Sequence, residues 1–246
     1  MRALEGKTAL VTGAAKRLGR ATALVLAEHG ANVVVHYNRS VEEADSTANG
    51  IREHGVLSWT LPADLGQPAE AARLMQRAAE ETGGVDILIN SASIFPADRL
   101  IDVSLESFEK NFRLNTFSPL EMCREFAKQG RGGAIVNFLD TRILDYDREH
   151  MSYHLSKRAL FTLTRAMAQE FAPSIRVNAV APGLVLPPAG KDQSYLDALA
   201  HTNPLQSHGS AEDVAAAVLF LVTNPFVTGQ VIYVDGGRHM LGGVYH

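Results

Sequence analysis

Short apolar runs alternate with longer amphipathic stretches along the chain. The apolar runs are rich in valine, isoleucine and leucine and mostly lack polar alternation, as is typical of strands buried on both faces of a parallel sheet. Strands are therefore predicted at residues 8–12, 32–36, 56–61, 85–90, 134–139, 175–180 and 231–234. Helical periodicity predicts helices at 18–29, 41–53, 68–81, 105–129, 151–171 and 211–222, the last opened by a capping pair, Ser210 and Asp213.

This alternation predicts an α/β fold, a doubly wound Rossmann-type parallel sheet with helices on both faces. No repeat, low-complexity run or polar linker divides the 246 residues, so we expect a single domain. Ligands of such sheets bind beyond the carboxyl ends of the strands, so the residues that follow each strand are the candidates for chemistry. Residues 184–210 have the length and the proline and glycine content of a substrate lid.

Composition narrows the class of partner. With 46% apolar and 20% charged residues and a net charge of −4, the chain gives no sign of a nucleic-acid or membrane partner, and we expect no metal site. The start M-R-A-L-E-G-K lacks the apolar run of a signal peptide, so the cytoplasm is the expected location. The single cysteine, Cys123, lies in a helical pattern that favours burial over reactivity.

A glycine-containing turn follows the first predicted strand, with the sequence T-G-A-A-K-R-L-G-R. Gly13 and Gly19 suit a turn where the backbone approaches a pyrophosphate that rests on the next helix N-terminus. The middle glycine of G-x-G-x-x-G is absent, and a plain strand–helix turn is the alternative. The predicted cofactor contacts here are Gly13, Lys16, Arg17, Leu18 and Gly19.

The end of the second strand indicates the choice of cofactor. A fold that selects NAD usually places an acid there to hold the ribose 2′-hydroxyl, but the segment H-Y-N-R-S contains none. Arg39 and Ser40, helped by Lys16, suit the 2′-phosphate of NADPH, although an ordinary surface arginine is the alternative. The contacts expected from this segment are Tyr37, Asn38, Arg39 and Ser40.

The third and fourth strands end in further candidates. Asp64, followed by Leu65, suits either the adenine edge or a helix cap. After the fourth strand, small residues would let a cofactor lie against the backbone. They are Asn90, Ser91, Ala92 and Ser93.

Tyr153 and Lys157 stand four residues apart early in a predicted helix, so they project from the same helix face. A nearby ammonium favours the phenolate and lowers the pKa of a tyrosine. Tyr153 is therefore a candidate general acid, and Lys157 a candidate for tuning it and holding the nicotinamide ribose. A chance occurrence of Y-x-x-x-K is the alternative, but its position after the fifth strand favours chemistry.

Taken together, these motifs resemble the short-chain dehydrogenase/reductase family along essentially the whole chain. The matching motifs are T-G-A-A-K-R-L-G, A-D-L, N-S-A-S, R-L-N-T, Y-H-L-S-K, R-V-N-A-V-A-P-G and V-D-G-G. The resemblance implies that Asn115 completes the catalytic set by supporting a water near Lys157; a helix-interior asparagine bonding its own backbone is the alternative. It also implies that the nicotinamide is covered by Pro182, Gly183 and Leu184.

Departures from the family pattern point to a branch. The family's usual serine, 13 residues before the tyrosine, is here Asp140, and Phe95 follows Ser93 in an S-x-F pattern. With Arg17 and H-Y-N-R-S, these residues look like the pteridine reductase branch, which reduces C=N bonds of dihydropterins with NADPH. A surface acid and simple core packing are the respective alternatives for Asp140 and Phe95.

The leading hypothesis is thus an NADPH-dependent pteridine reductase, by resemblance a homotetramer. Asp140 and Tyr153 would deliver the proton, Phe95 would stack on the substrate ring, and Arg17 and Ser93 would supply polar contacts. A carbonyl reductase acting on, for example, 3-oxoacyl thioesters and a non-catalytic NADPH-binding scaffold remain the alternatives. Asp140 and Phe95 argue against the first, and the intact set of Tyr153, Lys157 and Asn115 argues against the second.

Overall fold

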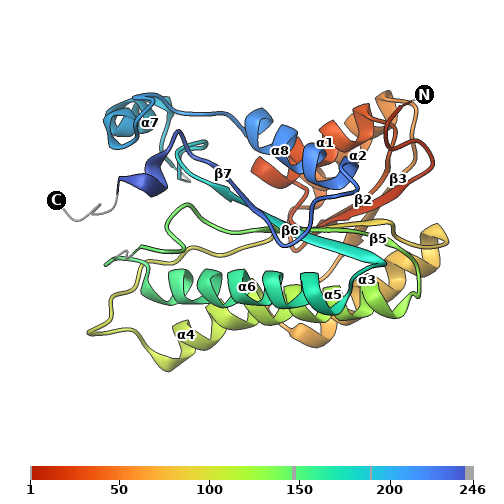
Figure 1. Cartoon of the computed structure of the whole chain (residues 1–246), viewed down its shortest axis with the longest axis horizontal. Helices are drawn as coiled ribbons and strands as arrows, with labels where there is room; N and C mark the ends of the chain where they lie inside the picture. The colour runs from red at the N-terminus through yellow and green to blue at the C-terminus, as the bar shows by residue number, and fades with distance from the viewer. Residues whose placement is uncertain (1, 146–147, 189, 242–246) are drawn as a thin grey trace.

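The strands form one parallel sheet in the computed structural model, which describes residues 2–145, 148–188 and 190–241 (Figure 1). Their order across the sheet is β3-β2-β1-β4-β5-β6-β7, so the chain winds outward in both directions from β1 and β4. Every neighbouring pair is parallel. This confirms the predicted Rossmann-type sheet. The strands are β1 (Thr8–Val11), β2 (Asn32–Tyr37), β3 (Ser58–Pro62), β4 (Ile87–Asn90), β5 (Gly133–Phe138), β6 (Ile175–Pro182) and β7 (Val231–Val234).

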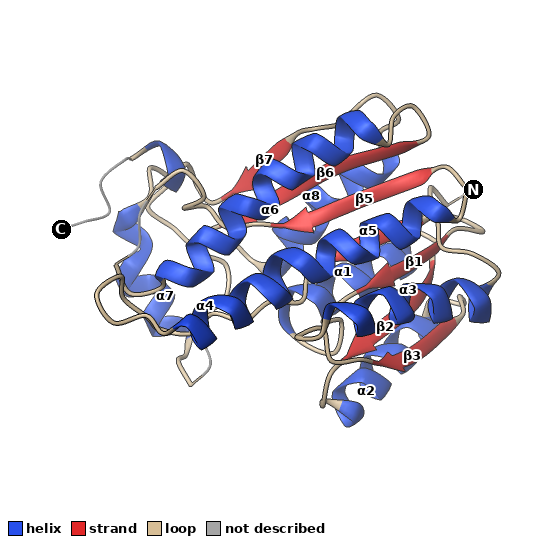
Figure 2. Cartoon of the chain, turned by 90° about the horizontal axis from the view of Figure 1, so that it is seen from below, coloured by secondary structure: helices blue, strands red, loops and turns tan. Residues whose placement is uncertain are grey.

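Helices cover both faces of the sheet. One face carries α1 (Arg17–Glu28), α2 (Val41–Glu53) and α8 (Ala211–Thr223), the last opened by the predicted capping box of Ser210 and Asp213. The other carries α3 (Pro68–Thr82), α5 (Ser118–Lys128) and α6 (Met151–Glu170). The latter three lie in front of the sheet in Figure 2, and α4 (Leu105–Phe112) runs on from them beside α6.

The unbroken apolar runs follow from this layering. Successive residues of β1 enter different cores, Leu10 the one under α3 and α5 and Val11 the one under α1 and α8. Each fully buried leucine or valine contributes about 1.5–3 kcal/mol. Cys123 lies fully buried in the core under α5, and burial raises its pKa to about 12. Its thiol is thus a packing group, as its flanks indicated.

The predicted single helix over residues 105–129 is wrong in one respect. A π-helical turn, Arg113–Phe117, separates α4 from α5. Apolar periodicity does not register such a turn, whose wider hydrogen-bonding pattern often marks functional sites. The turn carries Asn115, and its side chain leaves the helix axis to bind neighbouring segments.

The predicted lid contains secondary structure of its own. It carries α7 (Gln193–Leu199), which begins at an Asp192 cap, and a short 3-10 turn, Ala200–Thr202. Another 3-10 turn, Arg238–Met240, follows β7. These segments lie at the carboxyl end of the sheet, where the strand arrows point in Figure 2. Within the described ranges, no helix combines the length and hydropathy needed to cross a bilayer.

Candidate active site

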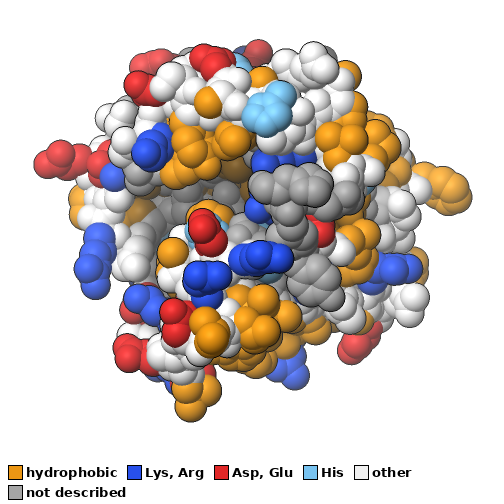
Figure 3. All heavy atoms as spheres, turned by 90° about the vertical axis from the view of Figure 1, so that its left-hand side faces the viewer, with side chains coloured by type: hydrophobic (Ala, Val, Ile, Leu, Met, Phe, Trp, Pro, Cys, Tyr) orange, Lys and Arg blue, Asp and Glu red, His pale blue; other side chains and the backbone are white. Residues whose placement is uncertain are grey.

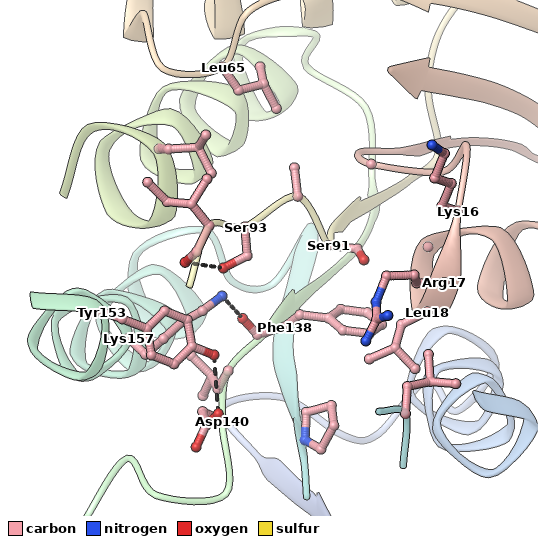
Figure 4. A pocket seen from close by; sticks show the side chains of 18 of the residues that line it. Lys16, Arg17, Leu18, Leu65, Ser91, Ser93, Phe138, Asp140, Tyr153 and Lys157 are labelled. Carbon is pink, nitrogen blue, oxygen red and sulfur yellow. Dashed lines mark hydrogen bonds between the residues drawn. The ribbon is translucent and has the colours of Figure 1, made fainter. Parts of the chain in front are cut away.

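A cavity of about 480 Å³ opens at the carboxyl ends of β1, β4, β5 and β6 (Figure 4). Most of the predicted site residues meet here, from segments far apart in the chain. In Figure 4 Tyr153, Lys157 and Asp140 lie on one side of it, and Lys16, Arg17 and Leu18 on the other. The predicted residues that line it are Gly13, Lys16, Arg17, Leu18, Gly19, Asn38, Leu65, Ser91, Ala92, Ser93, Asp140, Tyr153, Lys157, Pro182 and Gly183.

The glycine turn is held by a residue that the sequence analysis missed, His36 at the end of β2. The backbone N–H of Gly13 donates to His36 Nδ1 at 3.0 Å, and His36 Nε2 lies 3.1 Å from the carbonyl of Ala63. The imidazole therefore carries its proton on Nε2 and is neutral. Burial lowers its pKa to about 4. A histidine ending an apolar strand run was the available signal.

Small residues let the glycine turn and the loop after β4 pack closely. Gly13 has a φ of 64°, and a side chain there would start 3.1 Å from the Cα of Ala92. Thr12 Oγ1 accepts the N–H groups of Ser91 and Ala92 at 2.9 and 3.0 Å. A Cβ at Gly19 would lie 2.3 Å from the Gly13 carbonyl oxygen. This bare backbone beside the start of α1 fits a dinucleotide pyrophosphate.

The residues predicted to bind the 2′-phosphate lie just past β2. Asn38 lines the cavity, whereas Arg39, its neighbour, is solvent-exposed. Ser40 precedes α2 without capping it, so its hydroxyl makes no bond to the helix. Lys16 Nζ pairs with Glu43 Oε1 at 2.7 Å. Binding of a phosphate by Lys16, which stays a prediction, would require Lys16 to leave Glu43 or to contact both groups at once.

Some predicted contacts lie outside this cavity: Tyr37, Arg39, Ser40, Asp64, Phe95, Asn90, Asn115 and Leu184. The side chain of Asp64 accepts the N–H of Gly66 at 2.9 Å and so orders the turn before α3, whose N-cap is Gln67. The Asn90 side chain is buried in the sheet, where its Nδ2 donates to Asn137 Oδ1 at 2.8 Å. Both observations favour structural roles for these two side chains.

Tyr153 and Asp140 form a hydrogen-bonded pair. Tyr153 Oη donates to Asp140 Oδ2 at 3.1 Å, and the other carboxylate oxygen accepts the N–H of Arg142 at 2.8 Å. Asp140 follows β5, and Tyr153 lies in the first turn of α6. The acid that replaces the family's serine thus contacts the tyrosine hydroxyl directly.

Lys157 lies one helical turn beyond Tyr153 and is 2% exposed. Its Nζ donates to the carbonyl of Phe138 at 2.6 Å and lies 5.8 Å from the centre of the Tyr153 ring. Burial lowers the pKa of Lys157 to about 8, and the Asp140 charge opposes that shift. The lysine therefore keeps its positive charge at neutral pH but can lose it in mildly alkaline solution.

Asn115 joins three segments of the site. Its Oδ1 accepts hydrogen bonds from the Ser93 hydroxyl at 3.0 Å and from the N–H of Ile94 at 3.1 Å. Its Nδ2 donates a hydrogen bond to Ser156 Oγ at 3.1 Å. These bonds run to the loop after β4 and to α6. The alternative, in which Asn115 bonds the backbone of its own helix, is therefore wrong. Support of a water near Lys157 stays a prediction.

Phe95 lines a second cavity, which lies beside the first. Its ring stacks on His150 with a centroid distance of 3.7 Å and contacts Tyr153 edge-on at 4.6 Å. It is 50% exposed, so it is not a core residue. One face of the ring is covered by His150, and stacking on a substrate would use the opposite face or displace the imidazole.

Arg17 links the glycine turn to the predicted lid. It adopts a left-handed φ of 56°, and its Nη2 donates to the carbonyl of Pro187 at 2.8 Å. Such a φ is rare for a side chain of this size and occurs mostly where surrounding contacts impose it. Val185 and Leu186 from the same segment line the cavity. The glycine turn and the predicted lid therefore enclose the cavity together.

The fold and this site define an α/β oxidoreductase, and comparison with known proteins gives its family. A family model described as enoyl-(acyl carrier protein) reductase matches residues 13–239. The chain belongs to the short-chain dehydrogenase/reductase family. Versicolorin reductase 1 of Aspergillus parasiticus is 36% identical, over 95% of this chain and 97% of its own length. An L-rhamnose 1-dehydrogenase (NAD(P)(+)) of a Sphingomonas species is 31% identical, over 98% and 99%.

Solved structures agree with this assignment. FolM alternative dihydrofolate reductase 1 of Brucella canis, complexed with NADP, is 32% identical with a TM-score of 0.91, over 98% of this chain and 96% of that one. A short-chain dehydrogenase of Burkholderia cenocepacia, also in complex with NADP, is 34% identical with a TM-score of 0.91, over 97% and 99%. The named relatives thus include reductases of several kinds.

Proposed function

We propose that the protein is an NADPH-dependent pteridine reductase, which reduces a C=N bond of a dihydropterin or folate-like ring. The observation that carries this proposal is the 3.1 Å hydrogen bond from Tyr153 to Asp140. The NADP complexes among the similar structures support the cofactor, and the alternative dihydrofolate reductase among them supports the substrate class.

The hydrogen-bonding groups at the site, Tyr153 and Asp140, suit reduction of a C=N bond better than reduction of a ketone. A ketone reductase needs a hydroxyl donor beside the tyrosine to polarise the carbonyl, whereas Asp140 is an acceptor when ionised. A pterin ring offers an amino group and ring nitrogens, which a carboxyl can accept from or, when protonated, donate to. Asp140 would therefore orient the ring and share the proton of Tyr153.

NADPH, when bound, supplies a hydride to the ring carbon. Tyr153 Oη delivers the proton to the ring nitrogen, so that one C–H and one N–H bond form as the C=N double bond becomes single. The ammonium of Lys157 stabilises the phenolate left behind. Gly13, Gly19, Ser91 and Ala92 give the cofactor a bare backbone surface, and Asn115 holds the loop that carries Ser93 and Ile94 against α6.

A substrate panel combined with Asp140→Ser tests the proposal. NADPH oxidation would be followed with a dihydropterin, dihydrofolate, a quinonoid dihydropterin and an acetoacetyl thioester. We expect the pterins to be preferred, and Asp140→Ser to remove most pterin turnover while NADPH affinity stays nearly unchanged. Asp45→Ser, an exposed acid on α2, is the matched control.

Unchanged pterin turnover in Asp140→Ser, or a wild type that prefers the thioester, would overturn the proposal in favour of a carbonyl reductase. Turnover of any substrate would remove the alternative of a non-catalytic NADPH-binding scaffold.

The proposal includes a homotetramer that works in the cytoplasm. Large apolar side chains exposed on and before the α4–α5 segment support assembly, and the single buried cysteine suits a reducing compartment. The exposed residues are Leu100, Ile101, Leu105 and Phe117. Light scattering after size-exclusion chromatography would give the mass, and a monomer of 26.6 kDa would contradict the tetramer.

A further inference from the structure

A second cavity, of about 640 Å³, opens beside the catalytic residues. It shares Asp140, Pro182 and Gly183 with the first cavity, so the two cavities adjoin at these residues. Tyr195 and Leu199 of α7 line it from the lid side. Figure 3 views this end of the molecule and shows Lys and Arg side chains around a hollow. A ring held at Asp140 would extend a substituent into this space.

Arg238, in the 3-10 turn after β7, lines this second cavity. Its Nε is buried and has no hydrogen-bond acceptor in the part of the chain that the structure describes. Buried guanidinium N–H groups normally find acceptors, and a planar fork of donors matches a carboxylate or a phosphate. Arg238 therefore offers an unsatisfied donor to whatever enters the cavity.

Two further arginines, Arg142 and Arg148, line the same cavity. Burial first, and then the charge of Arg142, lower the pKa of Arg238, although Asp140, Tyr195 and Asp235 act in the opposite direction. The two guanidinium charges repel each other, and Asp140 and Asp235 offset that repulsion only in part, since the net shift of the Arg238 pKa is downward. A bound anion beside Arg238 would add to that offset.

The acids of the cavity limit where an anion can bind. Asp140 stands at the junction with the first cavity, and the exposed Glu149 lines the second. The described lining residues include three arginines and these two acids, and a further acid, Asp235, acts on Arg238 from beside the cavity. An anion would avoid both acids and bind against Arg238, under the α7 residue Tyr195.

We infer that this second cavity binds an anionic substituent of the substrate, a carboxylate or a phosphate, with Arg238 as its main ligand. The inference rests on the proposed function, because the substituent reaches the cavity from a ring held between Asp140 and Tyr153. It narrows the substrate from dihydropterins in general to those that carry a negatively charged side chain.

Three substrates that share one ring test this in the wild-type enzyme. They are a dihydropterin with a neutral hydroxymethyl side chain, the phosphate ester of that same compound, and dihydrofolate with its carboxylates. We expect kcat/KM to be about tenfold or more higher for at least one anionic substrate, chiefly through KM. Added salt should reduce this preference, because it screens charge–charge attraction. Comparing the phosphate with dihydrofolate identifies the kind of anion.

Arg238→Gln keeps a polar side chain, shorter than that of arginine, and removes the charge. The measured quantity is the ratio of kcat/KM for the anionic substrate to that for the neutral one, since effects common to both cancel. We expect this ratio to fall about tenfold in Arg238→Gln. It should stay constant in Arg73→Gln, an exposed arginine on α3 that pairs with Glu70. Arg142→Gln, with a smaller expected fall, serves if Arg238→Gln does not fold.

Each outcome decides the matter. A wild-type ratio near one, or a ratio unchanged by Arg238→Gln, overturns the anion site and leaves the proposed function in place. A wild type that neither binds nor reduces any of the three compounds overturns the proposed function, and the inference with it. Loss of activity towards the neutral and anionic substrates alike in Arg238→Gln would assign Arg238 to the structure of the site and overturn its role as a ligand.

Discussion

Asp98 caps helix α6, which carries Tyr153 and Lys157, through Ser152, although Asp98 and Ser152 are 54 positions apart. Asp98 Oδ1 accepts the N–H of Ser152 at 3.0 Å, and Oδ2 accepts the Ser152 hydroxyl and, at 2.9 Å, that of Ser107 in α4. His150, the residue before the helix, gives no side-chain cap. Burial acts to raise the pKa of Asp98, but the bonds from Ser152 and Ser107 hold it below its ordinary value. The loop carrying Phe95 is thus tied to the first turn of α6, where Tyr153 lies.

We therefore expect Asp98→Ala to lower stability by about 1 kcal/mol, the usual cost of losing an N-cap. It should also lower kcat by roughly tenfold, because the Tyr153 hydroxyl loses its fixed position. The affinity for NADPH should stay unchanged, since Asp98 does not line the first cavity. Urea unfolding and steady-state kinetics measure these effects, with Asp102→Ala in the same loop as the control. Full kcat in a destabilised Asp98→Ala would limit Asp98 to a structural role.

Arg39→Ala tests the cofactor choice. A hydrogen bond to a charged group is worth about 1.5–3 kcal/mol, so NADPH binding should weaken by roughly 10–100-fold. NADH binding should barely change, because NADH lacks the 2′-phosphate. Fluorescence titration with both cofactors measures this, with Arg77→Ala on α3 as the control. Equal weakening towards NADH and NADPH would mean that Arg39 acts through the structure of the β2–α2 loop.

The sheet and its layers could be predicted because buried parallel strands follow from local pattern, and the four-residue spacing placed Tyr153 and Lys157 on one helix face. The pairing of Asp140 with Tyr153 was expected only from the family resemblance. Contacts that depend on tertiary packing could not be found this way. The bond of His36 to Gly13 joins residues 23 apart, and the stack of Phe95 on His150 depends on the path of two loops. The π turn at Asn115 differs from an α-helix by one residue in its hydrogen bonds, which hydropathy does not register.

Tyr153→Phe keeps the ring and removes only the hydroxyl that donates to Asp140. Turnover should fall by about 10²–10⁴-fold, the usual contribution of a positioned general acid, while NADPH still binds. Single-turnover kinetics with saturating NADPH measure the chemical step. If half of the activity remains, another group delivers the proton. Tyr233→Phe, on β7, is the matched control.

His36 makes the fold sensitive to acid. Its pKa is about 4 in the folded protein and 6.5 as the ordinary value, so the unfolded chain binds more protons between these pH values. The contribution of neutral His36 to the free energy of unfolding is fully present above pH 6.5 and is lost as the pH falls towards 4. Between pH 7 and pH 5 the loss is about 2 kcal/mol. Urea unfolding at both pH values should show it, and His36→Asn, whose side chain does not titrate, should lose correspondingly less. An equal loss in both proteins would assign the acid sensitivity to other groups.

We expect Lys157 to set the alkaline limit of catalysis. Burial lowers its pKa to about 8, so its ammonium is lost as the pH rises through that value, well below the 10.5 of a free lysine. Without the charge, the phenolate of Tyr153 is no longer stabilised, and kcat should fall above pH 8. Lys157→Arg stays charged throughout, so any activity it retains should show this fall at a pH more than one unit higher. The measurement is kcat against pH from 6 to 10 for both proteins, with NADPH affinity determined at each pH to separate binding from chemistry. A wild-type profile that is flat to pH 9.5, or the same alkaline fall in Lys157→Arg, would show that the charge of Lys157 does not support the proton transfer.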